Sequence, residues 1–274
     1  MTLRQQAFDV RPLDIPIIDA HTHLGCHYGH GWHQNPKYTS TEALMQMYDT
    51  LGIDCCVTAP HPLIDGMGAL ANEICAREAE HFPGRVYGYI FVAPFEGMDV
   101  CRKSLETYSK NPAFVGLKFL GGYNGNYTDP IYEYAADFAN EAGCPLLCHT
   151  WGNKPTLQTM ADMAEKRPNL NLLLAHQGGG TRRWTEEAAI FVRDIPNVYM
   201  ELCGSLGNEL SFEDIRLLVG EDNMIFGTDA VNLDPRFDFG RLAFSIMPDS
   251  AKKKVFAGNF MKLLEKSQLG RIEL

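Results

Sequence analysis

Short apolar runs recur along the chain, and each is followed by a longer segment whose apolar positions have helical spacing. The runs are 16–20, 55–59, 86–92, 114–119, 145–148, 170–175, 198–202 and 224–226. Amphipathic spacing predicts helices over 39–51, 68–82, 98–109, 130–142, 154–166, 184–194 and 211–219. Because each connection is long enough to hold a helix, the strands are predicted to be parallel.

Eight such units in 274 residues predict an α/β protein, a (β/α)₈ TIM barrel that forms one domain over 1–274. Strands that are apolar on both faces suit a barrel wall, which is buried on both sides. An open doubly wound sheet is the alternative. It would need a Gly-rich phosphate turn after the first strand, and His21-Thr22-His23 stands there instead.

Local signals mark several helix ends. Ser211 followed three residues later by Asp214 is typical of a capping box at a helix start. Gly52, Gly143 and Gly220 are placed to end helices in a left-handed conformation.

The ends of the predicted strands carry the residue types that bind metals. His21 and His23 are separated by one residue, so on a strand they point to the same face and form a first pair of ligands. The other strand ends carry His61, Lys118, His149, His176, Glu201 and Asp229. Since barrel enzymes place their chemistry at the C-terminal ends of the strands, these residues predict a metal site at the barrel mouth.

Composition narrows the class of protein. The net charge of −10 and the lack of a basic run argue against a nucleic-acid partner. An apolar leader and an apolar stretch of membrane-spanning length are both absent, so we expect neither a signal peptide nor a membrane partner. Eight cysteines without paired spacing indicate a reduced, cytoplasmic protein. The sequence leaves open a homodimer.

Several motifs resemble the amidohydrolase superfamily of metal-dependent barrel enzymes. They are Ile18-Asp19-Ala20-His21-Thr22-His23, Pro145 to His149, Leu174 to Gly179, Phe226-Gly227-Thr228-Asp229 and Gly258 to Leu264. More narrowly, they resemble the amidohydrolase-related family that includes aminocarboxymuconate semialdehyde decarboxylase, resorcylate decarboxylase, oxalomesaconate hydratase and pyrone dicarboxylate lactonase. The resemblance implies a barrel and a metal site. It leaves the reaction open, because the family includes hydrolases, decarboxylases and hydratases.

Metal ligands are expected at His21, His23, His149 and Asp229, where Asp229 matches the family's final ligand and base. Asp229 alone would equally suit a helix cap. We favour a site with one divalent ion, and Zn²⁺ is the preferred ion. A site with two ions is the alternative. His176 is expected to be catalytic, either as a further ligand or as a group that polarises the substrate.

Lys118 is the third expected catalytic residue. A lysine in an apolar strand is costly to bury charged. The resemblance implies one role, a carboxylated lysine that bridges two ions. The alternative, which we favour, is an unmodified amine that binds a substrate anion. Glu201 is expected either to line the mouth or to form a salt bridge facing a helix.

Substrate contacts are expected from aromatic and basic residues beyond the strand ends. These are His61, Trp151, Tyr123, Arg182 and Arg236. An arginine can clamp a carboxylate, although arginines at such positions equally form surface ion pairs. The first loop adds His27, His30 and His33, for which substrate contact is favoured over metal storage.

The favoured reaction is hydrolysis of a small amide, lactone or carboxylated ring compound by a metal-activated water. Asp229 would take the proton of the water while His176 and Lys118 polarise the carbonyl, and Asp19 would fix the imidazole tautomers. The alternative is metal-dependent, non-oxidative decarboxylation of an aromatic or unsaturated acid, which needs the same ligands. A third interpretation is a purely structural metal site, which should be closed by four protein ligands.

Overall fold

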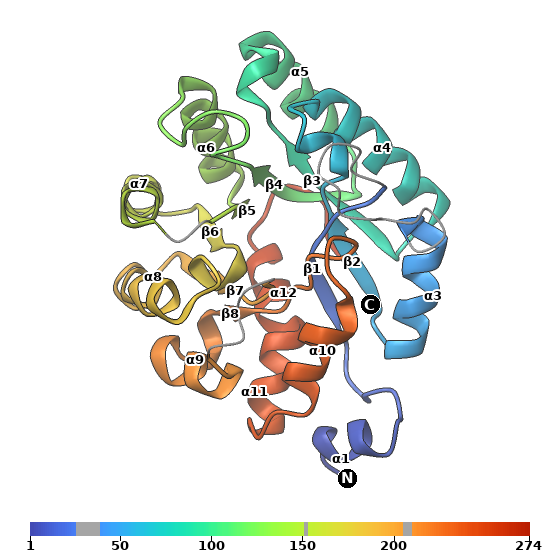
Figure 1. The fold of residues 1–274 in the computed structure, drawn as a ribbon. Coiled ribbons are helices and arrows are strands. Elements are labelled where there is room, and N and C mark those ends of the chain that lie inside the picture. Colours follow the sequence, from blue (N-terminus) through green and yellow to red (C-terminus); the bar gives the residue numbers. More distant parts are fainter. Residues whose placement is uncertain (26–38, 151–152, 205–209) are drawn as a thin grey trace.

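A computed structural model describes residues 1–25, 39–150, 153–204 and 210–274. Eight parallel strands form the centre of the molecule, with helices around them (Figure 1). The strands are β1 (Ile18–Thr22), β2 (Cys55–Thr58), β3 (Val86–Phe91), β4 (Phe114–Phe119), β5 (Pro145–Cys148), β6 (Asn171–Leu174), β7 (Val198–Glu201) and β8 (Met224–Ile225). Seven of them lie within the predicted runs, and β1 overlaps the run 16–20 and extends two residues beyond it.

The strands pair in chain order, from β1 to β8. Backbone hydrogen bonds also join β1 to the segment after β8: Ala20 N–H donates to the Phe226 carbonyl at 3.0 Å, and Asp229 N–H donates to the His21 carbonyl at 2.8 Å. These bonds bring the two ends of the sheet together. The predicted (β/α)₈ barrel is therefore confirmed.

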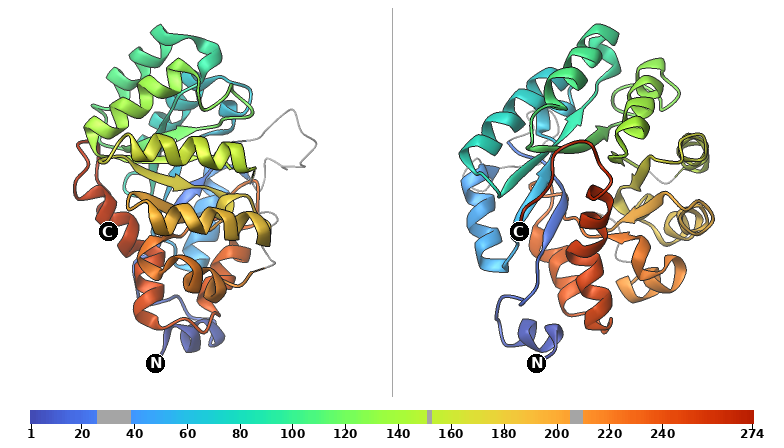
Figure 2. Two further views of the ribbon diagram at one scale, coloured as in Figure 1. Left: turned by 90° about the vertical axis from the view of Figure 1, so that its left-hand side faces the viewer. Right: turned by 180° about the vertical axis from the view of Figure 1, so that it is seen from behind.

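The helices that link consecutive strands also agree with the prediction. They are α3 (Thr41–Leu51), α4 (Gly68–His81), α5 (Met98–Tyr108), α6 (Pro130–Ala142), α7 (Lys154–Glu165), α8 (Arg182–Asp194) and α9 (Phe212–Val219). The described residues also form four helices that the spacing does not predict: α1 (Leu3–Phe8), α10 (Pro235–Ala243), α11 (Asp249–Lys253) and α12 (Asn259–Leu264). Figure 2 shows the layer of helices from the side and from behind.

The expected helix ends are largely present. Ser211 and Asp214 form both hydrogen bonds of a capping box at the start of α9. Gly52 and Gly143 end α3 and α6 in the left-handed conformation. Gly220 differs, because its positive φ of 78° is combined with an extended ψ of 148°.

Apolar side chains fill the barrel and the space between its wall and the helices. The C-terminal segment passes beside the starts of the strands, where Gly270 N–H donates to the carbonyl of Phe114, the first residue of β4, at 2.9 Å. Ile272 is buried in the same region. This segment lies at the end of the barrel opposite the mouth, which leaves the mouth for chemistry.

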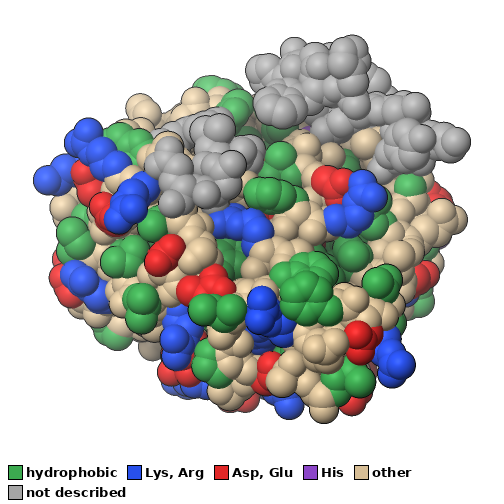
Figure 3. Space-filling model, turned by 60° about the horizontal axis from the view of Figure 1, so that its bottom comes forward, with side chains coloured by type: hydrophobic (Ala, Val, Ile, Leu, Met, Phe, Trp, Pro, Cys, Tyr) green, Lys and Arg blue, Asp and Glu red, His purple; other side chains and the backbone are tan. Residues whose placement is uncertain are grey.

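The described helices include none that is long and apolar enough to cross a membrane. Basic and acidic side chains are interspersed with hydrophobic ones on the face that Figure 3 shows.

Candidate metal centre

The histidine pair of β1 points into the mouth and is almost fully buried. His23 Nδ1 donates to the Ala59 carbonyl at 2.6 Å, and its Nε2 lies 3.1 Å from Asp229 Oδ1. His21 Nε2 lies 3.9 Å from the same oxygen. The two imidazoles and the carboxylate therefore converge, as the spacing of the histidines predicted.

Asp229 follows β8 and reaches the cluster through an unusual backbone conformation. Its φ is 57°, a region that residues other than glycine rarely adopt, and such strain is often stored at functional sites. Burial opposes ionisation of the carboxyl, but the hydrogen bond from His23 and the electrostatic influence of the His23, His176 and His21 rings hold its pKa well below the usual value. Asp229 is thus an anionic oxygen donor facing two imidazoles.

Lys118 brings a buried amine to the same place. Its Nζ lies 3.0 Å from His21 Nε2. Burial lowers the pKa of Lys118, and the nearby carboxylates of Asp229 and Glu201 oppose that shift. The amine faces the nitrogen lone pair that a metal ion would use.

His149 and His176 follow β5 and β6 and contact each other, with 3.0 Å between His176 Nε2 and His149 Nδ1. Burial lowers the pKa of His176 to about 4, so this ring is neutral at pH 7, and burial lowers the pKa of His149 well below its usual value. His176 and Gln177 share the positive φ of Asp229, at 55° and 56°. The expected roles of His149 as a ligand and of His176 in catalysis stay predictions.

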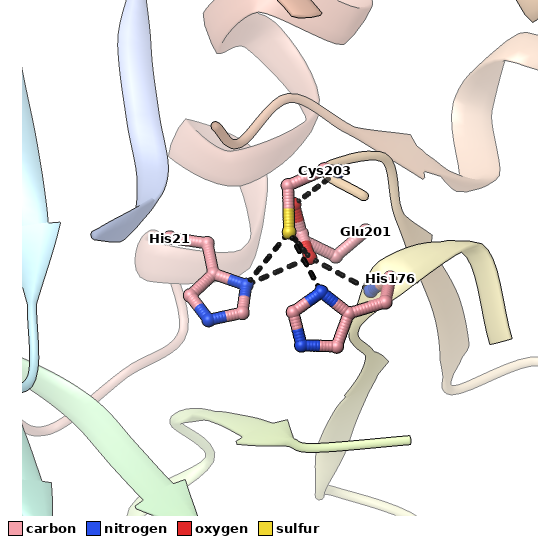
Figure 4. A group of neighbouring side chains, drawn as sticks. All are labelled: His21, His176, Glu201 and Cys203. Carbon is pink, nitrogen blue, oxygen red and sulfur yellow. Dashed lines mark hydrogen bonds and ion pairs between the residues drawn. The ribbon is translucent and has the colours of Figure 1, made fainter. Parts of the chain in front are cut away.

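Glu201 and Cys203, at the end of β7, complete the cluster (Figure 4). Glu201 Oε2 lies 2.9 Å from His21 Nδ1, and Cys203 Sγ lies 3.2 Å from Nδ1 of both His21 and His176. Glu201 therefore faces the histidines, and within the described part of the chain it forms no salt bridge that faces a helix. Cys203 was not recognised from the sequence, although Glu201 and Cys203 repeat the i, i+2 spacing of His21 and His23 at another strand end.

Gly227 makes this close approach sterically feasible. A Cβ atom at this position would lie 2.2 Å from Glu201 Oε1 and 2.8 Å from the Cβ of His21. Such distances are far inside van der Waals contact. The glycine between β8 and Asp229 thus leaves the space in which the carboxylate of Glu201 sits.

The expectation for Asp19 is wrong. Its carboxylate accepts hydrogen bonds from the Tyr48 hydroxyl at 2.5 Å, from the Thr228 hydroxyl, and from the backbone N–H of Thr228 and His21. It holds the backbone of β1 and of the segment after β8 in place, and burial raises its pKa to about 7. The oxygens that contact the imidazole Nδ1 atoms belong to Glu201 and Ala59 instead.

Two of the expected substrate-binding residues lie beside the cluster. His61 stacks on His23 with ring centroids 5.5 Å apart, and its Nδ1 donates to the Gly25 carbonyl at 2.6 Å. Tyr123 makes an edge contact with His149 at 5.6 Å. Both are in position to form the wall of a substrate pocket.

The two arginines are engaged elsewhere. Arg182 pairs with Glu186 one turn along α8, and 62% of its side-chain surface is exposed. Arg236 bonds Asp234 at the start of α10 with 66% of its side chain exposed. The structure thus does not bring them into the buried cluster. Trp151, His27, His30 and His33 lie outside the described residues.

Among the described residues, two groups have donor atoms close enough to hold one metal ion. The first is His21, His23 and Asp229, and the second is His21, His176, Glu201 and Cys203; within each group the donors lie within 4.8 Å of one another. The first group faces the mouth. Together with the fold, it defines a barrel with a metal-binding site at the C-terminal ends of its strands.

The family follows from a comparison with known proteins. The model of the amidohydrolase family matches residues 18–266, so this chain belongs to that family. This confirms the resemblance found in the strand-end motifs. No curated protein matches the chain.

Solved structures with the same fold include aromatic acid decarboxylases. 5-Carboxyvanillate decarboxylase from Novosphingobium aromaticivorans, with manganese and 4-hydroxy-3-methoxy-5-nitrobenzoic acid, has a TM-score of 0.74 and 14% identity over 92% of this chain and 96% of that chain. A dihydroxybenzoic acid decarboxylase from a Polaromonas species, with manganese and 2-nitroresorcinol, has a TM-score of 0.71 and 17% identity over 92% of this chain and 97% of that chain. 2,6-Dihydroxybenzoate decarboxylase from Rhizobium has a TM-score of 0.71 and 15% identity over 92% of this chain and 99% of that chain.

These comparisons overturn the expectation of hydrolysis. The structural neighbours described above are decarboxylases, which agrees with the alternative reaction and not with the favoured one. The error has a chemical reason. The same histidine and carboxylate donors serve both reactions, so the ligand motif could not separate them.

Proposed function

We propose that this chain is a metal-dependent, non-oxidative decarboxylase of an aromatic or unsaturated carboxylic acid. The observation that carries the proposal is the buried group of His21, His23 and Asp229 at the mouth of a barrel shared with aromatic acid decarboxylases. The nature of this donor set supports a divalent ion. Manganese in two neighbours makes Mn²⁺ a candidate beside Zn²⁺.

The donor set fits such an ion. His23 Nδ1 donates to a carbonyl oxygen, so Nε2, beside Asp229 Oδ1, is the nitrogen left to bind the ion. His21 Nε2 and Asp229 Oδ1 would complete the group, with His149 as the expected fourth ligand. When bound, the ion supplies a positive centre that orients the carboxylate and an adjacent oxygen of the substrate.

Decarboxylation breaks the bond between the ring carbon and the carboxylate, and the electron pair left on the ring carbon takes up a proton. Asp229 is placed to carry that proton on Oδ2, since Oδ1, 3.1 Å from His23 Nε2, is the oxygen assigned to the ion. Lys118 offers a buried amine for an anionic oxygen of the substrate. Burial of the cluster limits access of bulk water, which strengthens both electrostatic contacts.

The pocket wall supports a flat substrate. Tyr123 stands edge-on to His149, and His61 stacks on His23, so aromatic faces and edges border the cluster. Aromatic side chains favour offset or edge contacts with another ring. We include Trp151 in this wall on the sequence prediction alone. The exposed ion pairs of Arg182 and Arg236 favour Lys118 as the carboxylate partner.

The test is a substrate panel on metal-free protein reloaded with Mn²⁺ or Zn²⁺. The panel contains hydroxybenzoic acids, unsaturated dicarboxylic acids, lactones and amides, and the assay measures CO₂ release together with product formation. We expect metal-dependent CO₂ release from at least one hydroxylated aromatic acid. Hydrolysis of a lactone or amide without CO₂ release from any acid would refute the proposal.

A further inference from the structure

In two histidines of the cluster, the two ring nitrogens contact groups on opposite sides of the ring. His21 Nε2 faces Lys118 and Asp229 at the mouth, whereas its Nδ1 lies 2.9 Å from Glu201 Oε2. The front nitrogen is the one available to a metal ion. The back nitrogen is occupied by groups from β7.

His176 repeats this arrangement. Its Nε2 lies 3.0 Å from His149 Nδ1, whereas its Nδ1 lies 3.2 Å from Cys203 Sγ. Figure 4 shows Glu201 and Cys203 together between the two rings. One short strand end therefore contacts the back of both imidazoles.

The hydrogen bonds of Glu201 indicate which ring nitrogen of His21 carries the proton. Its Oε1 accepts from the Cys203 backbone N–H at 2.7 Å, and its Oε2 accepts from the His176 backbone N–H at 3.2 Å and from the Cys203 thiol at 3.1 Å. With these donors around it, an ionised carboxylate is an acceptor only. The fourth contact, from His21 Nδ1, is then an N–H donor.

We propose that Glu201 and Cys203 are a positioning pair that keeps His21 and His176 protonated at Nδ1 and turns both Nε2 lone pairs toward the mouth. Cys203 connects the two halves, because its thiol donates to Glu201 while its sulfur accepts from His176 Nδ1–H. The proposal rests on the proposed metal centre. Both residues contact the Nδ1 side of the imidazoles, which is turned away from the mouth, so both act through the histidines.

The same atoms suggest a rival interpretation, a second metal site made of His21, His176, Glu201 and Cys203. Such a site would need the thiol and both Nδ1 atoms to lose their protons. His21 would also have to give up both ring protons to serve the two sites at once. In the hydrogen-bonded arrangement each donor already has an acceptor within the group, so we favour the positioning role.

The first measurement is nitrogen-15 NMR of histidine side chains in the full-length, Zn²⁺-loaded protein. It distinguishes protonated from unprotonated ring nitrogens. We expect His21 and His176 to carry the proton on Nδ1. Protonation of His176 at Nε2, or loss of both His21 protons, would overturn the proposal.

The second measurement is Zn²⁺ affinity, by competition with a chelating dye, for three variants and one control. Loss of a residue that orients a metal ligand typically weakens affinity about 10- to 100-fold, and we expect this for Glu201→Gln. Cys203→Ser keeps a hydroxyl that both donates and accepts, so it should stay within a few-fold of wild type, whereas Cys203→Ala should bind more weakly. Cys144→Ser removes a buried thiol at the start of β5 and should match wild type.

Equal affinity of Cys203→Ala and wild type would overturn the role of Cys203, and an unchanged Glu201→Gln would overturn that of Glu201. If Glu201→Gln fails to fold, the Cys203 variants and the NMR of the wild type still decide. The second metal site is tested by loading the protein with Co²⁺ and recording its absorption spectrum. Binding of two ions per chain, with a thiolate-to-cobalt absorption band that is lost in Cys203→Ser, would make Cys203 a ligand and overturn the proposal. None of these measurements needs turnover. A result that refutes decarboxylase activity can therefore be distinguished from one that refutes the positioning role of Glu201 and Cys203.

Discussion

Gly227 offers a sharp test of how tightly the metal centre is built. In Gly227→Ala, the added Cβ would lie 2.2 Å from Glu201 Oε1 and 2.8 Å from His21 Cβ. Neither neighbour can yield freely, because His21 lies on β1 and Glu201 is held by hydrogen bonds on both oxygens. Overpacking of this kind typically costs about 1–3 kcal/mol of stability.

The damage should also reach metal binding. Displacement of Glu201 releases the Nδ1 side of His21, and loss of such orienting contacts costs about 10- to 100-fold in affinity. Gly240→Ala is the matched control. Its Cβ would meet Phe244 Cδ2 at 3.8 Å, an ordinary contact, and alanine stabilises a helix interior by about 0.5–1 kcal/mol over glycine.

The assay combines urea unfolding of the metal-free proteins with Zn²⁺ titration of the folded ones. We expect Gly227→Ala to lose stability and affinity together, and Gly240→Ala to lose neither. Wild-type stability and wild-type affinity in Gly227→Ala would show that the centre is looser than these distances indicate. Contact with Glu201 would then not be needed to orient His21.

Three further predictions follow from buried charges. Asp229→Asn removes the anionic donor and proton carrier, so CO₂ release should fall by about 10²- to 10⁴-fold while the circular dichroism spectrum is retained; full activity would refute its role. Lys118→Met removes the hydrogen-bond partner of His21 Nε2 and a buried positive charge, so calorimetry should show tighter metal binding by about tenfold, the scale of one hydrogen bond. A drop from two bound ions to one would instead indicate a bridging, carboxylated lysine. Burial raises the pKa of Asp238 to about 8. Between about pH 4 and 8 the folded state then binds more protons than the unfolded state, so the free energy of unfolding falls as pH rises, by at most about 1.4 kcal/mol per unit. Urea denaturation at pH 5 and pH 7.5 should show this decline in the wild type and not in Asp238→Asn. The same change in unfolding free energy in both proteins would mean that Arg241 keeps Asp238 ionised throughout.

The reaction and the contacts made by residues around the metal ligands were hard to predict from sequence. The sequence predicts that Asp19 orients an imidazole, yet its carboxylate accepts hydrogen bonds from Tyr48 and Thr228. The sequence predicts that Arg182 binds a substrate carboxylate, but Arg182 pairs with Glu186, one turn along its own helix. In each case the side chain bonds to a nearby residue that the sequence motif does not include.

The sequence by itself determined the eight strands, their parallel order and the placement of His21, His23 and Asp229 at the barrel mouth. These features follow from local periodicity, and parallel strands necessarily present their carboxyl ends at one edge. Only the tertiary structure decided that Glu201 and Cys203 lie behind His21, some 180 residues away in the chain. The reason is physical: spacing along a strand determines which face a side chain takes, whereas hydrogen-bond partners across a barrel depend on register, strain and the space that Gly227 leaves open.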